Sequence, residues 1–519
     1  MSDAPPNRFQ ARCCPCTSCP AGALSRRSLL KAGSLTIGGM AIGSVAWSAL
    51  AAAEGGEAEP VAPPRAALKI KPVLTYDVPK RRPATSWRSW GGIETEEQAK
   101  EEVARITGEL EKIKAAADFP LELMPVSAVR GAMPKEVHAE MEKADAVIVY
   151  PAGGGMGAAD AALKLGKPVI AFMRHRSGPV YLYYEIISPR YLHRHSDKLS
   201  TPGMDNTDVV VDSLDELTWR LRSLCGLKNT MGAKVVCIGG PDAWAQPKDV
   251  VPNLVRTKWK MDLQTVSYPE LGKLIQAAMA DPAAVALAKK RAAAYLNIPG
   301  TKLETELPFV ENAFLLEQVF RNLMTAAGTR YITINHCMGA IMPIGKTTAC
   351  LTLSLLNDEG YQAYCESDFV VIPSGILAVN ISNRPNFLND PTYPHDHLIT
   401  LAHCTAPRRM DGKNLEDARI LTHFESDYGA SPKVEMKKGT KVTNIIPDFA
   451  SAKWIGLAGE VADAPFLPIC RSQIEMAYQV DDLKVAQNMP GFHWMTIYGD
   501  YLREVGYALK RVPIAWEVL

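Results

Sequence analysis

The chain has 519 residues, of which 47% are apolar and 22% are charged, an ordinary composition for a soluble globular protein. This length exceeds what one hydrophobic core can use, so about three domains are expected. The formal net charge is only +1, which gives no electrostatic reason to expect nucleic acid or an anionic membrane surface as a partner.

The first 53 residues are typical of an export signal rather than of a folded domain. Arg26 and Arg27 precede a weakly apolar run over 35–53, and that run ends in small residues suited to cleavage. Paired arginines favour the twin-arginine export machinery. We therefore expect a periplasmic protein with a signal at 1–53 and a linker at 54–68, which is rich in Ala, Glu and Pro. The alternative is an uncleaved signal that anchors the protein in the membrane.

The cysteines fall into two sets. Four crowd into the signal region without the second pair that a metal motif of this kind needs. Seven are scattered through the remaining chain, and their odd number argues against a complete disulfide framework. Most of the seven are expected to be buried as small hydrophobic residues. The first set is Cys13, Cys14, Cys16 and Cys19, and the second is Cys225, Cys237, Cys337, Cys350, Cys365, Cys404 and Cys470.

Two α/β domains are predicted, over 69–230 and 231–360, because strand-like and helix-like segments alternate at a spacing that implies parallel pairing. After about residue 360 the strands become shorter and turns more frequent, which predicts a β-rich domain over 361–519. The expected helices lie at 95–116, 158–165, 268–279, 283–295, 309–327, 348–357 and 501–510, and the expected strands include 121–124, 146–150, 168–172, 234–238 and 331–334.

Two glycine-containing turns loosely resemble nucleotide-binding motifs. The turn from Gly153 to Gly157 lacks an acidic residue at the end of the following strand, so a plain tight turn is favoured. The segment 340–347 fits a relaxed phosphate loop between a strand and a helix. Its interior is bulky and contains Pro343, whereas a phosphate cradle needs free backbone N–H groups. Neither motif is favoured as a nucleotide site.

The block from 330 to 405 carries most of the chemistry. Glu366 and Asp368 are two residues apart, so on a strand both carboxylates would share one face. Ion pairs at a strand end are the less favoured alternative for them, and His403 beside Cys404 fits a core histidine nearly as well as a binding residue. His395 and His397 suggest a metal site at i, i+2, although a solvated turn is favoured.

Short motifs in this block and beyond it resemble the L-fucose isomerase family, within the fucose and arabinose isomerase superfamily. Their shared order carries the resemblance. They are Leu355-Leu356-Asn357-Asp358-Glu359-Gly360, Cys365-Glu366-Ser367-Asp368, Phe387-Leu388-Asn389-Asp390, Leu401-Ala402-His403-Cys404, Cys470-Arg471-Ser472-Gln473, Pro490-Gly491-Phe492-His493-Trp494 and Tyr498-Gly499-Asp500-Tyr501.

The resemblance implies two Rossmann-like α/β domains followed by a β-rich C-terminal domain, in a homo-oligomer of three or six chains. It also implies aldose–ketose isomerisation of a monosaccharide with a divalent metal of the Mn²⁺ type. Asp368 and His493 match metal ligands by position. Arg471, Asn389, Asp390 and His403 would hold the sugar. A hard cation can chelate both reacting sugar oxygens and stabilise the enediolate while a carboxylate moves the proton.

The sequence departs from this family at one point of the expected site. After the strand at 331–334 the family has a second metal-binding, proton-moving Glu, but this chain has no acidic residue there before Asp358. His336 or Glu366 would have to replace it, alongside Asp368 as the third catalytic candidate. The alternative is a periplasmic carbohydrate-binding protein that has lost isomerase activity. His493 could then serve packing alone, and Arg471 could simply tie two domains together.

Overall fold

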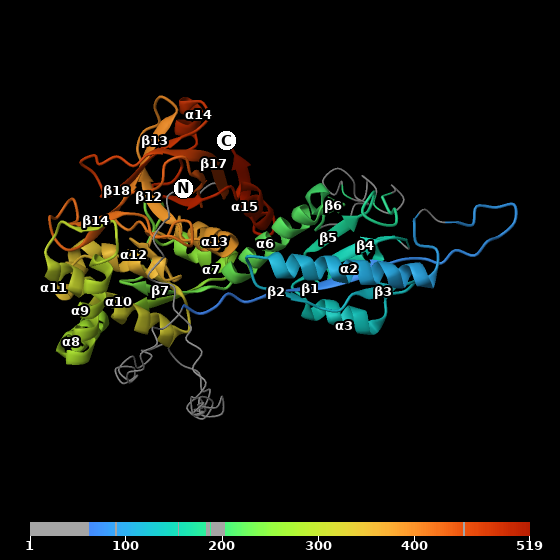
Figure 1. Cartoon of the computed structure of the whole chain (residues 1–519), viewed down its shortest axis with the longest axis horizontal. Coiled ribbons are helices and arrows are strands. Elements are labelled where there is room, and N and C mark those ends of the chain that lie inside the picture. The colour runs from blue at the N-terminus through green and yellow to red at the C-terminus, as the bar shows by residue number, and fades with distance from the viewer. Residues whose placement is uncertain are drawn as a thin grey trace. The chain divides into compact units, whose positions relative to one another are not determined.

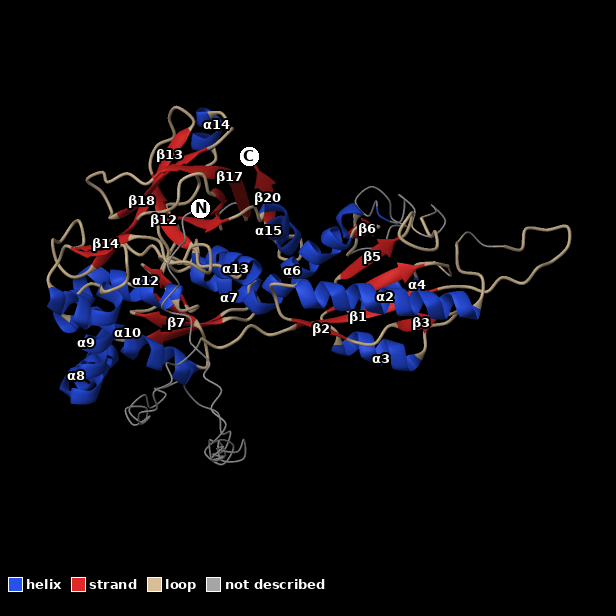
Figure 2. Ribbon diagram, viewed as in Figure 1, coloured by secondary structure: helices blue, strands red, loops and turns tan. Residues whose placement is uncertain are grey.

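The computed structural model describes residues 62–88, 91–153, 155–182, 187, 192, 203–449 and 452–519. The predicted export signal, with its four cysteines, lies outside these residues, and so does the predicted linker as far as residue 61. The described chain contains two parallel sheets, a larger C-terminal sheet and a small three-stranded sheet, with helices packed around them (Figures 1 and 2).

The first sheet has the strand order β2-β1-β4-β5-β6, and β3 also pairs with β1. Every pairing in it is parallel, as the sequence predicts. The elements of this region are β1 (Leu68–Thr75), α2 (Glu96–Ala116), β2 (Leu121–Leu123), β3 (Ser127–Val129), α3 (Lys135–Lys143), β4 (Ala146–Pro151), α4 (Gly157–Lys164), β5 (Val169–Met173), β6 (Val209–Val211) and α6 (Leu214–Thr230).

Helices cover both faces of this sheet, which explains why its strands are apolar throughout. Ile148 and Tyr150 of β4 share a buried cluster with Ile106 of α2 and with α6. Their neighbours Val147 and Val149 point the other way and pack in a second cluster with α3 and α4. Figure 1 shows α2 and α3 on opposite sides of the strands.

The second sheet has the order β11-β10-β7-β8 and is also parallel. Its last strand, β11, lies just beyond residue 360, in the segment that the sequence analysis assigned to the β-rich region. The elements are β7 (Lys234–Ile238), α7 (Val251–Lys258), β8 (Asp262–Val266), α8 (Tyr268–Ala280), α9 (Pro282–Leu296), β9 (Thr301–Leu303), α10 (Leu307–Ala327), β10 (Tyr331–Ile334), α11 (Met342–Gly345), α12 (Cys350–Asp358), β11 (Gln362–Cys365) and α13 (Ile372–Ser382).

Helix boundaries follow local chemistry that is readable in the sequence. The Thr95 side chain accepts a hydrogen bond from the Gln98 N–H at 3.1 Å, and the Gln98 side chain accepts one from the Thr95 N–H at 3.2 Å, so α2 starts with a capping box. At the end of α12, Gly360 adopts a φ of 88° and Tyr361 donates its N–H back to Leu356. This arrangement is a Schellman motif, as the glycine predicted.

The segment that resembled a phosphate loop is helical. Residues Cys337–Ile341 form a π-helical turn that continues into α11. The N–H of Ala340 is bonded to the carbonyl of His336, and the N–H of Lys346 to that of Met342. Because these donors are already engaged, the segment offers no cradle of free N–H groups to a phosphate.

The third region is built around a sheet of order β16-β19-β12-β13-β18-β17-β20, in which β16 also pairs with β17, so that six strands close into a ring. Its ladders are antiparallel except for the last strand, β20. The elements are β12 (Phe387–Pro391), β13 (Leu398–His403), β14 (Ala418–Leu421), β15 (Ser431–Val434), β16 (Lys441–Ile446), β17 (Lys453–Asp463), β18 (Ser472–Ala477), α14 (Asp482–Gln487), β19 (Trp494–Tyr498), α15 (Leu502–Leu509) and β20 (Ala515–Val518).

The chain is therefore mixed α/β, with two parallel sheets followed by a mainly antiparallel one. Strands β14, β15 and β9 form the small sheet, which joins the second region to the third. Among the described residues, no single helix is long and apolar enough to cross a membrane. Two bent pairs of helices have the required length and apolar composition when each pair is taken together: α8 with α9, and 337–345 with α12.

The contact between α6 and α13 depends on a glycine. A Cβ atom on Gly226 would overlap Ile381 Cγ1 and come within 3.0 Å of the Ile381 nitrogen. We expect Gly226→Ala to lower the free energy of unfolding by about 1–3 kcal/mol, the usual cost of overpacking. Gly108→Ala is the matched control, because Gly108 is an exposed helical glycine with no atom within 4 Å of an added Cβ. That change should stabilise α2 by up to about 1 kcal/mol. Denaturant unfolding of both variants tests this, and equal effects would contradict it.

Candidate functional site

Polar side chains meet at the ends of the parallel strands β10 and β11. Strands β12 and β13 of the closed sheet lie beside these ends. This is the edge of a parallel sheet at which ligands usually bind. A cavity of about 290 Å³ lies there. Its lining residues are Trp244, Cys337, Met338, Cys350, Cys365, Glu366, Asp390, His403, Cys404, His423, Glu425, Cys470 and Phe492.

Glu366 and Asp368 are held by a turn, which corrects the expectation that they share one face of a strand. Strand β11 ends at Cys365, and Glu366 and Ser367 then take left-handed φ values of 65° and 48°. Such values cost energy for residues other than glycine, and they often occur at functional sites. Asp242, beyond the end of β7, fixes the turn by hydrogen bonds to Ser367 and Phe369. The turn directs the Glu366 side chain into the cavity, whereas Asp368 is buried behind the cavity wall.

Asp368 orients His493 and is completely buried in doing so. One carboxylate oxygen of Asp368 lies 2.7 Å from His493 Nδ1. The other accepts the backbone N–H groups of Trp244 at 3.1 Å and Val370 at 3.0 Å. Since a carboxylate only accepts, His493 carries its proton on Nδ1 and presents Nε2 to the cavity.

His493 Nε2 and Asp390 Oδ1 are buried atoms that form no hydrogen bond. They lie 3.2 Å apart, within ion-pair distance, and Nε2 is also 3.4 Å from a Glu366 oxygen. Buried polar atoms without partners are rare in folded proteins, and at a cavity they commonly mark the place of a ligand or ion.

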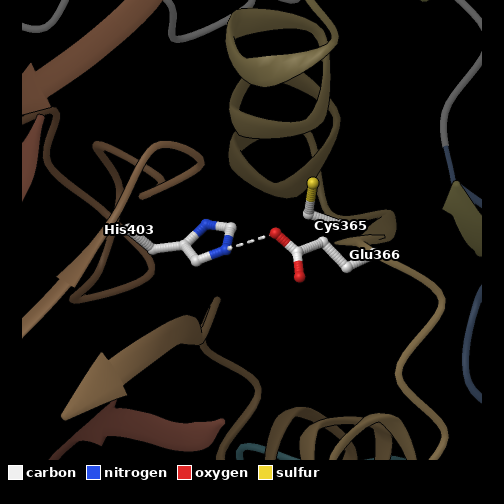
Figure 3. Close-up of side chains that lie close together, drawn as sticks. All are labelled: Cys365, Glu366 and His403. Atoms are coloured by element: carbon white, nitrogen blue, oxygen red, sulfur yellow. Dashed lines mark ion pairs between the residues drawn. The ribbon is translucent and has the colours of Figure 1, made fainter. Parts of the chain in front are cut away.

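His403 completes the polar group. Its Nδ1 lies 3.0 Å from the Thr405 hydroxyl, so Nε2 is the nitrogen that faces the cavity. That atom is 3.9 Å from Glu366 Oε1, and Figure 3 shows the imidazole and the carboxylate facing each other with the Cys365 side chain beside them. Two sets of ligand atoms come within 4.8 Å of one another: Cys365, Glu366 and His403, and also Asp390, His403 and His493.

The two cavity carboxylates titrate in opposite directions. Burial would raise the pKa of Glu366, but the 3.4 Å contact with His493 Nε2 and the positive charges of His403 and His493 outweigh it, so the pKa is lowered. Burial raises the pKa of Asp390 against the opposing charges of both histidines. Glu366 therefore stays ionised as a cation ligand must, while Asp390 is poised to carry a proton.

Three residues expected at the site lie apart from this cluster. His336 is exposed, and it does not line the cavity. Asn389 is buried with its side chain bonded to Phe387 and Thr496, on the opposite side of β12 from Asp390. The Arg471 guanidinium donates to the Thr422 carbonyl and hydroxyl, a contact within the C-terminal region.

Sequence reasoning missed the thiols and the aromatic pair. Five cysteines that are scattered in the sequence line one cavity, and the only sequence signal was that Cys337, Cys365 and Cys404 each fall at or just after a strand end. Trp244 and Phe492 stack with ring centroids 5.2 Å apart and planes at 23°, and both are partly exposed. They form an aromatic wall beside the polar group.

No family model matches the chain, and a search of the curated proteins finds no match either. The resemblance to the L-fucose isomerase family stays a prediction.

Replacing Asp368 by Asn tests its orienting role. An amide at this position would donate to His493 Nδ1 and shift the ring proton to Nε2, which then faces the site as a donor. The amide also removes the carboxylate that raises the pKa of His493. We expect the pKa of this imidazole, measured by NMR titration of the metal-free protein, to fall in Asp368→Asn. Asp396→Asn, in the exposed turn before β13, should leave the pKa unchanged. Equal pKa values in the two variants would contradict the role.

The stability of the metal-free protein should depend on His493. Burial lowers the pKa of this imidazole, but the hydrogen bond to Asp368 and the ion-pair contact with Glu366 outweigh burial and raise the pKa to about 10. The resulting stabilisation is fully present below the ordinary pKa of about 6.5 and disappears as the pH rises through about 10. Denaturant unfolding in chelator should therefore show stability falling between these pH values. In His493→Gln the fall should be shallower, and an identical slope would argue against the ion pairs.

Proposed function

We propose that the protein is an exported, divalent-metal-dependent aldose–ketose isomerase that acts on a monosaccharide in the cavity beside β10–β13. One observation carries the proposal: Glu366, Asp390 and His403 line one cavity, and the buried His493 Nε2 lies 3.2 Å from Asp390 Oδ1 and 3.4 Å from Glu366 without a hydrogen bond of its own. The volume of about 290 Å³ is at the small end of ligand pockets, which suits one sugar ring better than a nucleotide. Two parallel sheets, one of them covered on both faces, support the Rossmann-like domains that the resemblance implies.

Glu366 and His403 fit the role of cation ligands. The carboxylate is ionised because its pKa is lowered, and the imidazole presents Nε2 while Thr405 holds Nδ1. The resemblance suggests Asp368 and His493 as ligands and Mn²⁺ as the cation. The geometry favours Asp368 as the group that orients His493, because its oxygens are already engaged.

A divalent cation would polarise the two oxygens between which the sugar isomerises. Asp390 then moves the proton: it lines the cavity, its Oδ1 makes no hydrogen bond, and its raised pKa favours proton uptake and return. His493, held by Asp368, can hydrogen-bond the reacting oxygens. Asp390 thereby replaces the glutamate that the chain lacks after β10.

A carbohydrate-binding protein is the second candidate, and the aromatic wall favours it. Trp244 and Phe492 offer flat apolar surface next to hydrogen-bonding groups, which is how sugar rings are commonly held. Binding alone would need this wall and the polar group but no proton carrier.

The test is a turnover screen on protein from the exported fraction, loaded with Mn²⁺, Co²⁺ or Zn²⁺ and given a panel of aldoses and ketoses in D₂O. Interconversion with deuterium at the reacting carbons supports the isomerase. We expect Asp390→Asn to keep the metal and lose about 10²- to 10⁴-fold in rate, and His403→Ala to lose both metal and rate. His397→Ala, an exposed histidine in the turn before β13, is the control and should match wild type.

A sugar that raises the unfolding temperature but is not turned over would show that the protein binds carbohydrate and is not an isomerase. Saturation at 100 times Kd would stabilise the fold by about 2.7 kcal/mol. Loss of turnover in His397→Ala as well would show that the variants act through folding rather than through the site.

A further inference from the structure

We propose that the thiols of Cys337 and Cys365 complete the coordination of the cation, so that the site binds a thiophilic ion of the zinc class and not Mn²⁺. This inference rests on the proposed cation at Glu366 and His403, and it names that cation's class and its two remaining ligands.

Three of the four ligand atoms are already gathered, and the fourth contacts one of them. Cys365 Sγ, a Glu366 carboxylate oxygen and a His403 ring nitrogen lie within 4.8 Å of one another (Figure 3). Cys337 Sγ is 3.5 Å from Cys365 Sγ. An ion that binds sulfur at about 2.3 Å in a tetrahedron holds two sulfur ligands about 3.8 Å apart, so the two thiols already stand close to the spacing that one ion requires.

The fold explains why these two thiols meet. Strands β10 and β11 are parallel neighbours with Ile334 paired to Cys365, so the residues after Ile334 emerge beside the end of β11. The chain turns at His336, whose φ is 48°, and Cys337 opens the π-helical turn. Single π-turns of this kind often occur at functional sites. Both thiols are buried, which protects them from solvent oxidants.

The chemistry of the four ligands decides the class of cation. Thiolates are soft ligands that favour zinc and similar ions, whereas Mn²⁺ prefers carboxylate and water oxygens. Two thiolates, one imidazole and one carboxylate make an ordinary zinc set. Each thiol releases its proton to solvent as it ligates, which balances the binding step. Zinc can accept a fifth ligand, so one of the two reacting oxygens can approach the ion, while His493 and Asp390 remain free to hydrogen-bond the other.

Three more thiols line the same cavity, from Cys350, Cys404 and Cys470. Cys404 is hydrogen-bonded to Cys350, Cys470 and His423, so these three thiols form a group of their own, whereas Cys337 contacts Cys365. We therefore assign them to the wall of the cavity, and they supply sharp controls.

The experiment is cobalt substitution of the metal-free full chain, because Co²⁺ bound to thiolate shows a charge-transfer absorption that oxygen and nitrogen ligands do not give. We expect one Co²⁺ per chain with this absorption, displaced by Zn²⁺ and not by Mn²⁺. Cys365→Ser and Cys337→Ser should each reduce the absorption and weaken Zn²⁺ binding by more than about 100-fold, beyond the roughly 10- to 100-fold cost of losing an orienting partner. Cys237→Ser, buried in β7 outside the cavity, should change neither.

Other outcomes would overturn the proposal. Stoichiometric Co²⁺ without the sulfur absorption would show that oxygen and nitrogen ligands alone hold the ion. An absorption that survives Cys365→Ser and disappears in Cys404→Ser would move the ion to the other thiols. A disulfide between Cys337 and Cys365 in the exported protein, detected by mass spectrometry without reduction, would exclude both as ligands.

The results separate this inference from the proposed function. Turnover with cobalt bound by oxygen and nitrogen ligands alone would support the isomerase and reject the thiols as ligands. Sulfur-ligated cobalt without turnover on any sugar would support the thiols as ligands and reject the isomerase activity.

Discussion

The hydrogen bond between Asp368 and His493 is the interaction on which the site depends. It joins a turn after β11 to the residue before β19, 125 positions later in the chain, and both side chains are almost completely buried. Burying a carboxylate is costly unless its oxygens are engaged, and here the imidazole and two backbone N–H groups engage them. The bond therefore stabilises the contact between two sheets, and it also sets which ring nitrogen faces the cavity.

The strand ends supply the remaining groups. Parallel strands β10 and β11 finish at the same edge, and β12 and β13 of the closed sheet bring Asp390 and His403 to that edge from outside. Opposite charges then collect where water is scarce, so neighbouring groups shift each other's pKa. Glu366 and Asp390 are the same kind of group in the same cavity, yet their pKa values move in opposite directions. Under the proposed function, this divergence suits Glu366 to the cation and Asp390 to the proton.

Much of the fold was predictable because it rests on local signals. The capping box at Thr95 and the glycine at 360 mark helix ends, and apolar runs between them mark parallel strands. The site was only partly predictable. Motif order pointed to Glu366, Asp390, His403 and His493, which do converge. The expectation of a strand through Glu366–Asp368 failed, because the left-handed turn there is imposed by tertiary contacts with Asp242 and has no glycine to announce it. Asn389 and Asp390 were both expected at the site, but adjacent residues of a strand point to opposite faces, and only Asp390 lines the cavity.

The contact between the two thiols could not be predicted from their spacing in the sequence. Cys337 and Cys365 are 28 residues apart, with a helix between them, and no short motif connects them. Only the parallel register of β10 and β11 makes them neighbours. Free thiols in an oxidising compartment are readily lost to disulfides unless they are buried or bound to a metal. If the chain is exported by a route that carries folded proteins, a metal inserted before export would hold both thiols reduced while the carboxylate and imidazole beside them complete its coordination. The same ion that activates a sugar would then also protect the cysteines that bind it.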